Sequence, residues 1–281
     1  MSAMALSMEA VSLSFGAKRV LDNLTFSVPR GQAFGFLGPS GAGKTTTIKL
    51  LTRQLTCDGG RVTLFGRPIE RATAADYERI GILSDTSALY DRMSIADNLA
   101  LYGRLRGASR RRVPHLLERL GLAGDGKTLI KNCSKGMRQR AALAASLVHQ
   151  PELLFLDEPT SGLDPAARAE VHKMLGELRD RGTTVFLTTH DMAEAEAVCD
   201  RVAILSDGAI VACDDPEELK LRYARNRVVI RTRTRGTFEV AKDAAGADLI
   251  DDLMRAGELV SIHSDEPNLE EVFLEVTGRE F

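Results

Sequence analysis

Polar and apolar residues alternate in three short stretches of the first 66 residues, which is the pattern of half-buried β-strands. The stretches cover residues 11–15, 24–28 and 62–65. A glycine-rich turn at residues 38–43 follows a short apolar run, and the apolar positions after this turn, which end with Leu50 and Leu51, indicate a helix. The N-terminal region is therefore expected to contain strands and one helix.

A helical insert is predicted next, at about residues 89–140. Strand alternation is absent there, and apolar residues recur at helical spacings, at positions 95, 99, 102, 105, 116, 117 and 120. The insert also carries arginines at positions 104, 106 and 110–112. Such a run is typical of a solvated charged face, although it also suits a surface near anionic lipid.

Two apolar runs further along the chain have the composition of buried parallel strands. Residues 153–156 are followed by an Asp-Glu pair, and residues 184–187 are followed by Thr-Thr-His. The segment between the runs has a helical pattern, as the crossover between parallel strands requires. Because α/β sheets bind ligands beyond the carboxyl ends of their strands, we expect these polar residues to lie at a ligand site.

The pattern changes again after an Asp-Gly pair at residues 207–208, which suits a hairpin turn. From about residue 228 the chain reads strand, strand, helix, strand, helix, and the last helix has an apolar stripe at positions 269, 272, 273 and 276. We therefore expect a large domain at residues 1–225 and a small accessory α+β domain at residues 226–281.

Composition restricts the partners of the chain. Its 37 Lys and Arg against 39 Asp and Glu give a net charge of -2, so there is no general electrostatic reason to expect nucleic-acid binding. The four cysteines lack the paired spacing of a zinc site or a disulfide framework. No apolar run approaches the roughly 18 to 20 residues of a membrane span, and the first residues do not resemble a secretory signal, so a cytoplasmic location is expected.

The most specific motif is the glycine-rich segment from Gly38 to Thr45, which matches the P-loop spacing and lies between a strand and a helix. In such a loop, backbone N–H groups surround a polyphosphate, assisted by the positive end of the following helix. Lys44 would supply a cation to the terminal phosphates, and the Thr45 hydroxyl would bind Mg²⁺. The alternative, a turn that only connects strand and helix, does not explain the Lys-Thr ending. The nucleotide-binding residues predicted here are Gly38, Pro39, Ser40, Gly41, Ala42, Gly43, Lys44, Thr45 and Thr46.

The Asp157 and Glu158 pair supplies the carboxylates that phosphoryl transfer to water needs. Asp157 is placed to hold Mg²⁺ directly or through water, and Glu158 is placed to act as general base for the attacking water. Without a P-loop, an acidic pair that caps the turn before Pro159 would be the commoner interpretation. His190 ends the next strand and could contact the γ-phosphate or orient the water, whereas a purely structural histidine is an equal alternative on position alone.

Together with these residues, the segment from Cys133 to Arg140 resembles the ABC transporter ATPase family, and the resemblance covers about residues 8–208. The family signature, usually LSGGQ, reads CSKGM here, and residues 161–164 look like the D-loop. The resemblance implies ATP and Mg²⁺ as cofactors. It also matches His190 to the family's switch histidine, which gives a predicted catalytic set of Lys44, Glu158 and His190.

The resemblance further implies a site that two subunits share by pairing head to tail. The signature of one subunit would contact the γ-phosphate held by Lys44 of the other. Ser134 also resembles an N-cap, and the helix behind it would aim free N–H groups at an anion, although such a pentapeptide alone is most often just a helix start. The predicted contacts in trans are Ser134, Lys135, Gly136 and Met137.

Other site residues follow from the same resemblance. Asp164 would couple the two sites across the interface, and Phe15 stands where family members carry a ring that stacks on adenine; a buried strand phenylalanine is the alternative. Asp85 replaces the usual Q-loop glutamine, and its carboxylate can still engage Mg²⁺ or its water. Acidic Q-loops, SKGM-type signatures and tails like residues 265–274 resemble the branch that exports drugs, antibiotics, lantibiotics and sodium.

The expected fold is α/β, with a P-loop NTPase (RecA-like) core sheet, an antiparallel β subdomain, a helical subdomain and a small α+β C-terminal appendage. The expected function is the ATP-binding and ATP-hydrolysing subunit of an ABC transporter, with export favoured. It would drive a separate integral membrane permease at the inner face of the cell membrane and pair with a second copy of itself or a paralogous ATPase. The alternative is a non-transport ABC ATPase that acts on ribosomes, nucleic acid or protein assembly.

Overall fold

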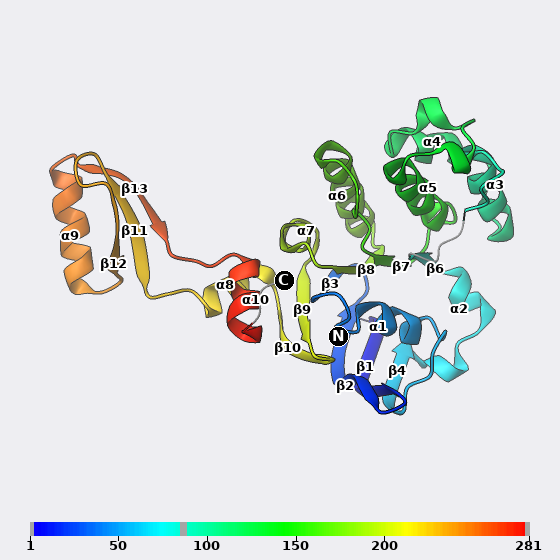
Figure 1. The fold of residues 1–281 in the computed structure, drawn as a ribbon, viewed down its shortest axis with the longest axis horizontal. Coiled ribbons are helices and arrows are strands. Elements are labelled where there is room, and N and C mark those ends of the chain that lie inside the picture. Colours follow the sequence, from blue (N-terminus) through cyan, green and yellow to red (C-terminus); the bar gives the residue numbers. More distant parts are fainter. Residues whose placement is uncertain (1–2, 85–88, 279–281) are drawn as a thin grey trace. The chain divides into compact units, whose positions relative to one another are not determined.

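Three sheets carry the strands of the computed structural model, which describes residues 3–84 and 89–278 (Figure 1). The chain divides into a first unit that ends at Asp214 and a second unit that begins at Asp215. The strands are β1 (Met4–Phe15), β2 (Lys18–Pro29), β3 (Ala33–Leu37), β4 (Gly59–Leu64), β5 (Arg67–Pro68), β6 (Ile80–Leu83), β7 (Leu153–Asp157), β8 (Thr184–Thr189), β9 (Arg201–Ser206), β10 (Ala209–Asp214), β11 (Arg227–Thr232), β12 (Thr237–Ala241) and β13 (Leu259–Ser264). The α-helices are α1 (Lys44–Leu51), α2 (Ala74–Glu78), α3 (Ile95–Leu105), α4 (Arg112–Arg119), α5 (Lys135–Leu147), α6 (Pro165–Asp180), α7 (Met192–Val198), α8 (Pro216–Arg222), α9 (Ala244–Arg255) and α10 (Leu269–Thr277).

A six-stranded sheet with the order β10-β9-β3-β8-β7-β6 forms the centre of the first unit. Strands β3, β7 and β8 are buried along their whole length. Because side chains on both faces of these strands are covered, their sequences are continuous apolar runs rather than alternating ones. β7 pairs with β8 in parallel register, and β8 pairs in parallel with β3, so the predicted parallel strands are confirmed. Their carboxyl ends therefore lie together at one edge of the sheet.

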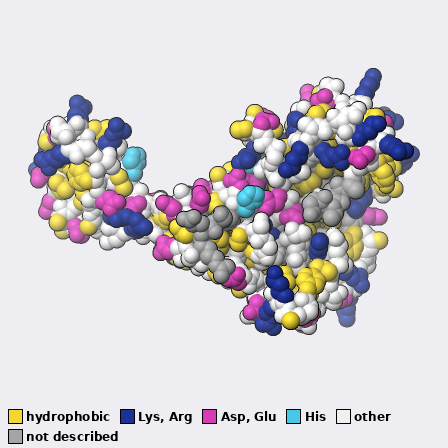
Figure 2. Space-filling view, viewed as in Figure 1, with side chains coloured by type: hydrophobic (Ala, Val, Ile, Leu, Met, Phe, Trp, Pro, Cys, Tyr) yellow, Lys and Arg dark blue, Asp and Glu magenta, His cyan; other side chains and the backbone are white. Residues whose placement is uncertain are grey.

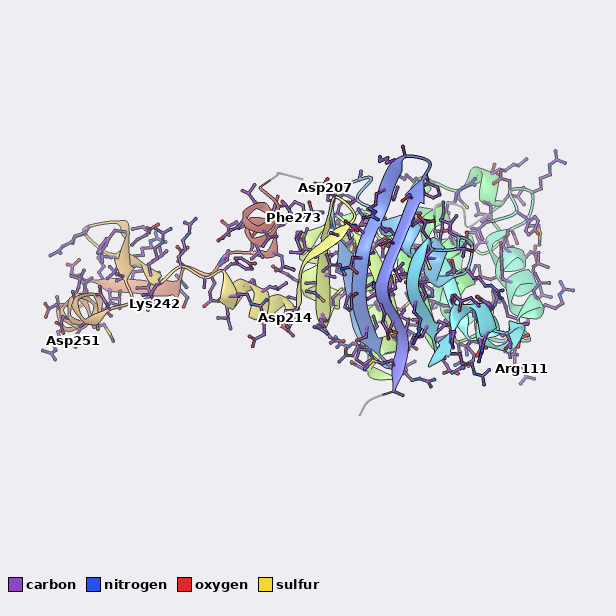
Figure 3. All side chains as sticks on the ribbon, turned by 90° about the horizontal axis from the view of Figure 1, so that it is seen from below. Arg111, Asp207, Asp214, Lys242, Asp251 and Phe273 are labelled. Carbon is purple, nitrogen blue, oxygen red and sulfur yellow. The ribbon has the colours of Figure 1, made fainter. Side chains whose placement is uncertain are left out.

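The second sheet of this unit has the order β2-β1-β4-β5 and is antiparallel throughout. Its long strands β1 and β2 lie side by side (Figure 3). Phe26 of β2 lies 5.4 Å from Phe34 and 5.4 Å from Phe36 of β3, and Phe186 of β8 lies 5.8 Å from Phe34, measured between ring centroids. The two sheets thus share one aromatic core, which fixes β3 and the loop that follows it.

Helices α3, α4 and α5 lie where the helical insert was expected and pack on one another, and α5 continues beyond residue 140 to Leu147. Ser94 caps α3 by accepting a hydrogen bond from the Asp97 N–H, and this hydrogen bond satisfies a free N–H in the first turn of the helix. Within the described residues, no helix is both long and apolar enough to span a membrane. The strand β6 and the short helix α2 before the insert were not predicted from the sequence.

The second unit contains the predicted order of strand, strand, helix, strand, helix, preceded by α8. Its antiparallel sheet has the order β12-β11-β13, and α9 contributes Leu253 to a small core with Val228, Ile230 and Val240. The stripe of α10 is buried at Leu269, Val272 and Phe273, as the apolar spacing predicts.

Candidate nucleotide site

The P-loop connects β3 to α1, and its glycines occupy positions where other residues do not fit. Gly43 has a φ of 112°, and a Cβ added to it would lie 2.5 Å from Cδ2 of Leu21. A Cβ on Gly38 would lie 2.5 Å from the carbonyl oxygen of Leu205. Gly41 has a φ of 82° with open space around it. The loop therefore needs glycine at positions 41 and 43 for positive φ, and at positions 38 and 43 for close packing.

The ammonium of Lys44 is held over the mouth of this loop. Its Nζ donates to the carbonyl oxygens of Gly38, at 2.5 Å, and Pro39, at 3.2 Å. The Lys44 side chain is only 7% exposed, and Oε1 of Glu158 lies 3.6 Å from Nζ. Burial lowers the pKa of Lys44, while the charges of Glu158 and Asp157 oppose that shift. A buried cation with two carbonyls and one carboxylate around it is well placed to meet a terminal phosphate.

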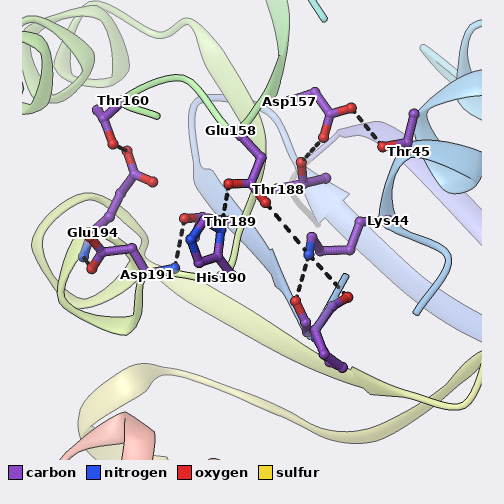
Figure 4. A network of polar contacts seen from close by, with 12 residues as sticks. Lys44, Thr45, Asp157, Glu158, Thr160, Thr188, Thr189, His190, Asp191 and Glu194 are labelled. Carbon is purple, nitrogen blue, oxygen red and sulfur yellow. Dashed lines mark hydrogen bonds and ion pairs between the residues drawn. The ribbon is translucent and has the colours of Figure 1, made fainter. Parts of the chain in front are cut away.

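Asp157 lies at the end of β7 and is almost fully buried. Its Oδ2 accepts a hydrogen bond of 2.7 Å from the Thr45 hydroxyl, and its Oδ1 accepts one from the Thr188 hydroxyl (Figure 4). The Thr45 hydroxyl oxygen, in the first turn of α1, and Oδ2 of Asp157, at the end of β7, are thus adjacent. This donor set fits Mg²⁺, which binds through one or two protein oxygens and the oxygens of a phosphate substrate.

Glu158 follows Asp157 directly, and its carboxylate lies between the side chains of His190 and Lys44. Oε2 of Glu158 lies 2.5 Å from Nδ1 of His190, and Oε1 faces Lys44 (Figure 4). A cavity of about 290 Å³ opens beside this carboxylate. It is lined by Ser40, Gly41, Gly43, Lys44, Thr45, Thr46, Asp157 and Glu158. The structure therefore brings the predicted P-loop, carboxylate and histidine residues to one edge of the sheet.

The segment that follows Glu158 is tied down by side chains that the sequence did not single out. Nε2 of Gln139, on α5, donates to the carbonyl oxygens of Glu158, at 3.2 Å, and Pro159, at 3.1 Å. The Thr160 hydroxyl donates to Oε1 of Glu194 at 2.8 Å, and Glu194 on α7 is 1% exposed. A local signal existed for Gln139, because it lies two residues beyond the signature segment, but its partner is 19 residues away in the sequence.

The signature residues begin α5 in the predicted capping arrangement. The Ser134 hydroxyl accepts a hydrogen bond of 3.2 Å from the Met137 N–H, and Ser134 is exposed. The Lys135 side chain packs on Gly162 of the same chain, where an added Cβ would lie 3.0 Å from Cε of Lys135. None of residues 134–137 is among the described residues that line the 290 Å³ cavity. Ser134 and Lys135 are therefore exposed outside this cavity, and Lys135 lies beside Gly162 of the same chain.

The remaining predicted site residues have separate places. Asp164 caps α6 by accepting a hydrogen bond of 3.0 Å from the Ala167 N–H, and this bond holds the pKa of Asp164 below its ordinary value. Phe15, at the end of β1, is 52% exposed, so the interpretation as a buried strand phenylalanine is wrong. Phe15 is also absent from the described lining of the cavity. Asp85 lies outside the described residues.

Comparisons with known proteins decide the family. Residues 21–161 match the family model described as ABC transporter. The chain belongs to the ABC transporter family. This ABC protein is 42% identical to the fluoroquinolones export ATP-binding protein of Mycobacterium tuberculosis over 269 aligned residues. The alignment covers 94% of this chain and 89% of that relative. It is 37% identical to a daunorubicin resistance ATP-binding protein of Streptomyces coeruleorubidus, over 98% of this chain and 96% of the relative.

The fold leads to the same family. A solved structure described as an ATP binding subunit of an ABC transporter superposes with a TM-score of 0.72 and is 28% identical, over 78% of this chain and 93% of that one. The predicted P-loop NTPase fold is confirmed by this likeness and by the parallel core sheet. The ABC ATP-binding subunits hydrolyse ATP to power transport, so the chain is an ATPase subunit of the transporter family, related to exporter ATP-binding proteins.

Proposed function

We propose that the chain is the motor subunit of an exporter, in which ATP binding and hydrolysis drive a separate integral membrane permease. The relatives named above are export and resistance ATP-binding proteins, and this supports export over import. The observation that carries the proposal is the cluster of Lys44, Asp157, Glu158 and His190 at the mouth of the P-loop. That cluster contains the groups that ATP hydrolysis requires.

In this proposal each residue of the cluster has a separate task. The loop N–H groups and Lys44 hold the phosphates of ATP, and Glu158 takes a proton from the attacking water. His190, 2.5 Å from Glu158, orients that carboxylate and the water beside it. Thr45 and Asp157 would hold Mg²⁺, which neutralises charge on the phosphate oxygens.

The exposed signature supports pairing with a second copy or a paralogous subunit. Ser134 and Gly136 lie at the start of a 13-residue helix whose first N–H groups carry partial positive charge. Residues 134–137 do not contribute to the described lining of the chain's own phosphate cavity. In a head-to-tail pair, the signature of one copy would cover the ATP held by Lys44 of the other, which completes two sites at once.

The helical insert is the proposed contact to the permease, at the inner face of the cell membrane. Lys and Arg side chains gather over α3 and α4 (Figure 2), and Arg104, Arg110 and Arg111 are exposed. Tyr90, just before the insert helices, is 56% exposed and offers a large apolar surface. An exposed basic surface suits a position next to anionic lipid, and an exposed aromatic side chain suits a contact with a cytoplasmic loop of a membrane protein.

The test is purification of the full chain, with an affinity tag, from detergent-solubilised membranes of cells that also produce a candidate integral membrane permease. We expect the permease to copurify and the complex to hydrolyse ATP. The Lys44→Ala variant should retain the permease and lose hydrolysis, because its change lies in the phosphate site alone. Recovery of the wild-type chain with ribosomes or nucleic acid, and without the permease, would contradict the proposal.

A further inference from the structure

Glu158 has a backbone conformation that an L-residue avoids. Its φ is 49°, in the left-handed region, where the Cβ crowds the neighbouring carbonyl. Glu158 is neither glycine nor asparagine, so its own chemistry does not favour this conformation. Contacts from the surrounding structure must therefore hold the residue in place.

Those contacts lie on both sides of the residue. The Glu158 N–H donates to the carbonyl oxygen of Thr188 at 3.0 Å, which fixes the end of β7 to β8. The Glu158 carbonyl oxygen accepts from the Ser161 N–H at 3.2 Å, within the turn itself, and from the Gln139 amide at 3.2 Å. The second N–H of the same amide reaches the carbonyl oxygen of Pro159 at 3.1 Å. Gln139 is thus the side chain, among the described residues, that bridges two consecutive carbonyls of this turn.

We infer that Gln139 is a positioning residue for hydrolysis, which acts by holding the Glu158 backbone so that the carboxylate faces the water site. The inference rests on the proposed role of Glu158 as general base. With the amide in place, the carboxylate lies between His190, at 2.5 Å, and Lys44, at 3.6 Å. Without the two amide hydrogen bonds, the backbone of Glu158 keeps only its hydrogen bonds to Thr188 and Ser161. We expect the turn then to relax toward negative φ, which turns the carboxylate away from the phosphate cavity.

The position of Gln139 gives this contact a second consequence. Gln139 lies on α5, five residues after Ser134, which is the residue proposed to meet the ATP of the partner subunit. A shift of α5 on closure of the pair therefore reaches the Glu158 carbonyl through one side chain. The hydrogen bond from Thr160 to the buried Glu194 anchors the far side of the same turn. Loss of Gln139 is therefore expected to misplace the turn and not to unfold it.

The first experiment compares Gln139→Met, which keeps the length of the side chain and removes both donors, with Gln150→Met, an exposed glutamine just beyond the same helix. We expect Gln139→Met to lower kcat about 10- to 100-fold, because small displacements of a reacting group have effects of this size. KM for ATP and Tm should stay close to wild type in both variants, and Gln150→Met should keep the wild-type kcat. Gln139→Glu offers no donor at neutral pH and should lose kcat to a similar degree. If Gln139→Met fails to fold, the kcat of Gln139→Glu tests the inference in its place.

The second experiment repeats Gln139→Met in a Glu158→Gln background. A residue that acts only through the Glu158 carboxylate should change the residual rate of that background by less than about 2-fold. A wild-type kcat in folded Gln139→Met and Gln139→Glu would overturn the inference, as would an equal fold-loss in both backgrounds. Wild-type hydrolysis by Glu158→Gln alone would instead refute the general-base role, so the two failures are distinguishable.

Discussion

Nδ1 of His190 lies 2.5 Å from Oε2 of Glu158, at the carboxyl ends of two neighbouring parallel strands. The other oxygen of the same carboxylate faces the ammonium of Lys44 at 3.6 Å. Glu158 therefore lies between the residue that follows β8 on one side and Lys44, at the end of the P-loop, on the other. The parallel pairing of β7 and β8 is what brings these residues together, because it aligns the two strand ends.

Glu158→Gln should bind ATP and hydrolyse it about 10²- to 10⁴-fold more slowly, because the amide keeps the shape of the side chain and cannot accept the proton of water. ATP that is not hydrolysed should hold two copies together, so light scattering after size exclusion should give twice the 30.6 kDa monomer mass in ATP and the monomer mass without nucleotide. Rapid turnover by this variant would refute the assignment of the general base.

His190→Ala should reduce kcat and leave KM for ATP largely unchanged, because His190 contacts the Glu158 carboxylate and is absent from the described lining of the phosphate cavity. Since Glu158 would still be present, we expect a loss of about 10- to 100-fold, smaller than that of Glu158→Gln. His263→Ala, at an exposed histidine of the second unit, is the matched control and should retain the wild-type rate. An unchanged kcat in His190→Ala would show that the contact is only structural.

Gly43→Ala should destabilise the chain and abolish nucleotide binding, because Gly43 combines a φ of 112° with a neighbour 2.5 Å from the added Cβ. Gly41→Ala has a φ of 82° but open space around it, so it carries the backbone penalty alone, about 1 kcal/mol. Thermal unfolding should rank wild type first, Gly41→Ala second and Gly43→Ala last. An equal Tm for the two variants would mean that close packing at Gly43 contributes nothing.

Maleimide should react with Cys133 slowly at neutral pH, because burial raises the pKa of this thiol and the thiolate is the reactive form. The labelling rate, followed by peptide mass spectrometry, should rise steeply from about pH 7 to about pH 9. A label at Cys133 stands next to Ser134 and should block the ATP-dependent pairing of the Glu158→Gln variant. Labelled protein that still pairs in ATP would place Cys133 outside the interface.

Sequence reasoning located the P-loop, the carboxylate pair and His190 because each one ends or follows an element with a clear pattern. Strands β7 and β8 are continuous apolar runs, and the polar residues at their ends then had to share one edge of the sheet. The helical insert was predictable from a different pattern, the recurrence of its apolar residues at helical spacings.

Other parts were hidden because they depend on contacts between distant segments. The strand β6 has only four residues, Ile80–Leu83, and its pairing with β7 is not encoded in a local pattern. The amide of Gln139 binds carbonyl groups, which every residue carries, so its partners cannot be identified from residue types. The buried pair of Thr160 and Glu194 spans 34 residues and likewise has no sequence signal.

The most direct test of the shared site is a mixture of two inactive variants, Lys44→Ala and Ser134→Arg. In a head-to-tail pair of one copy of each, both changes fall in one composite site, and the other site has an intact P-loop and an intact signature. Mixing equal amounts should therefore restore ATP hydrolysis, up to about a quarter of the wild-type rate for random pairing with one active site in each mixed pair. If the mixture hydrolyses no more ATP than the two variants measured separately, although they form mixed pairs, the shared site is contradicted.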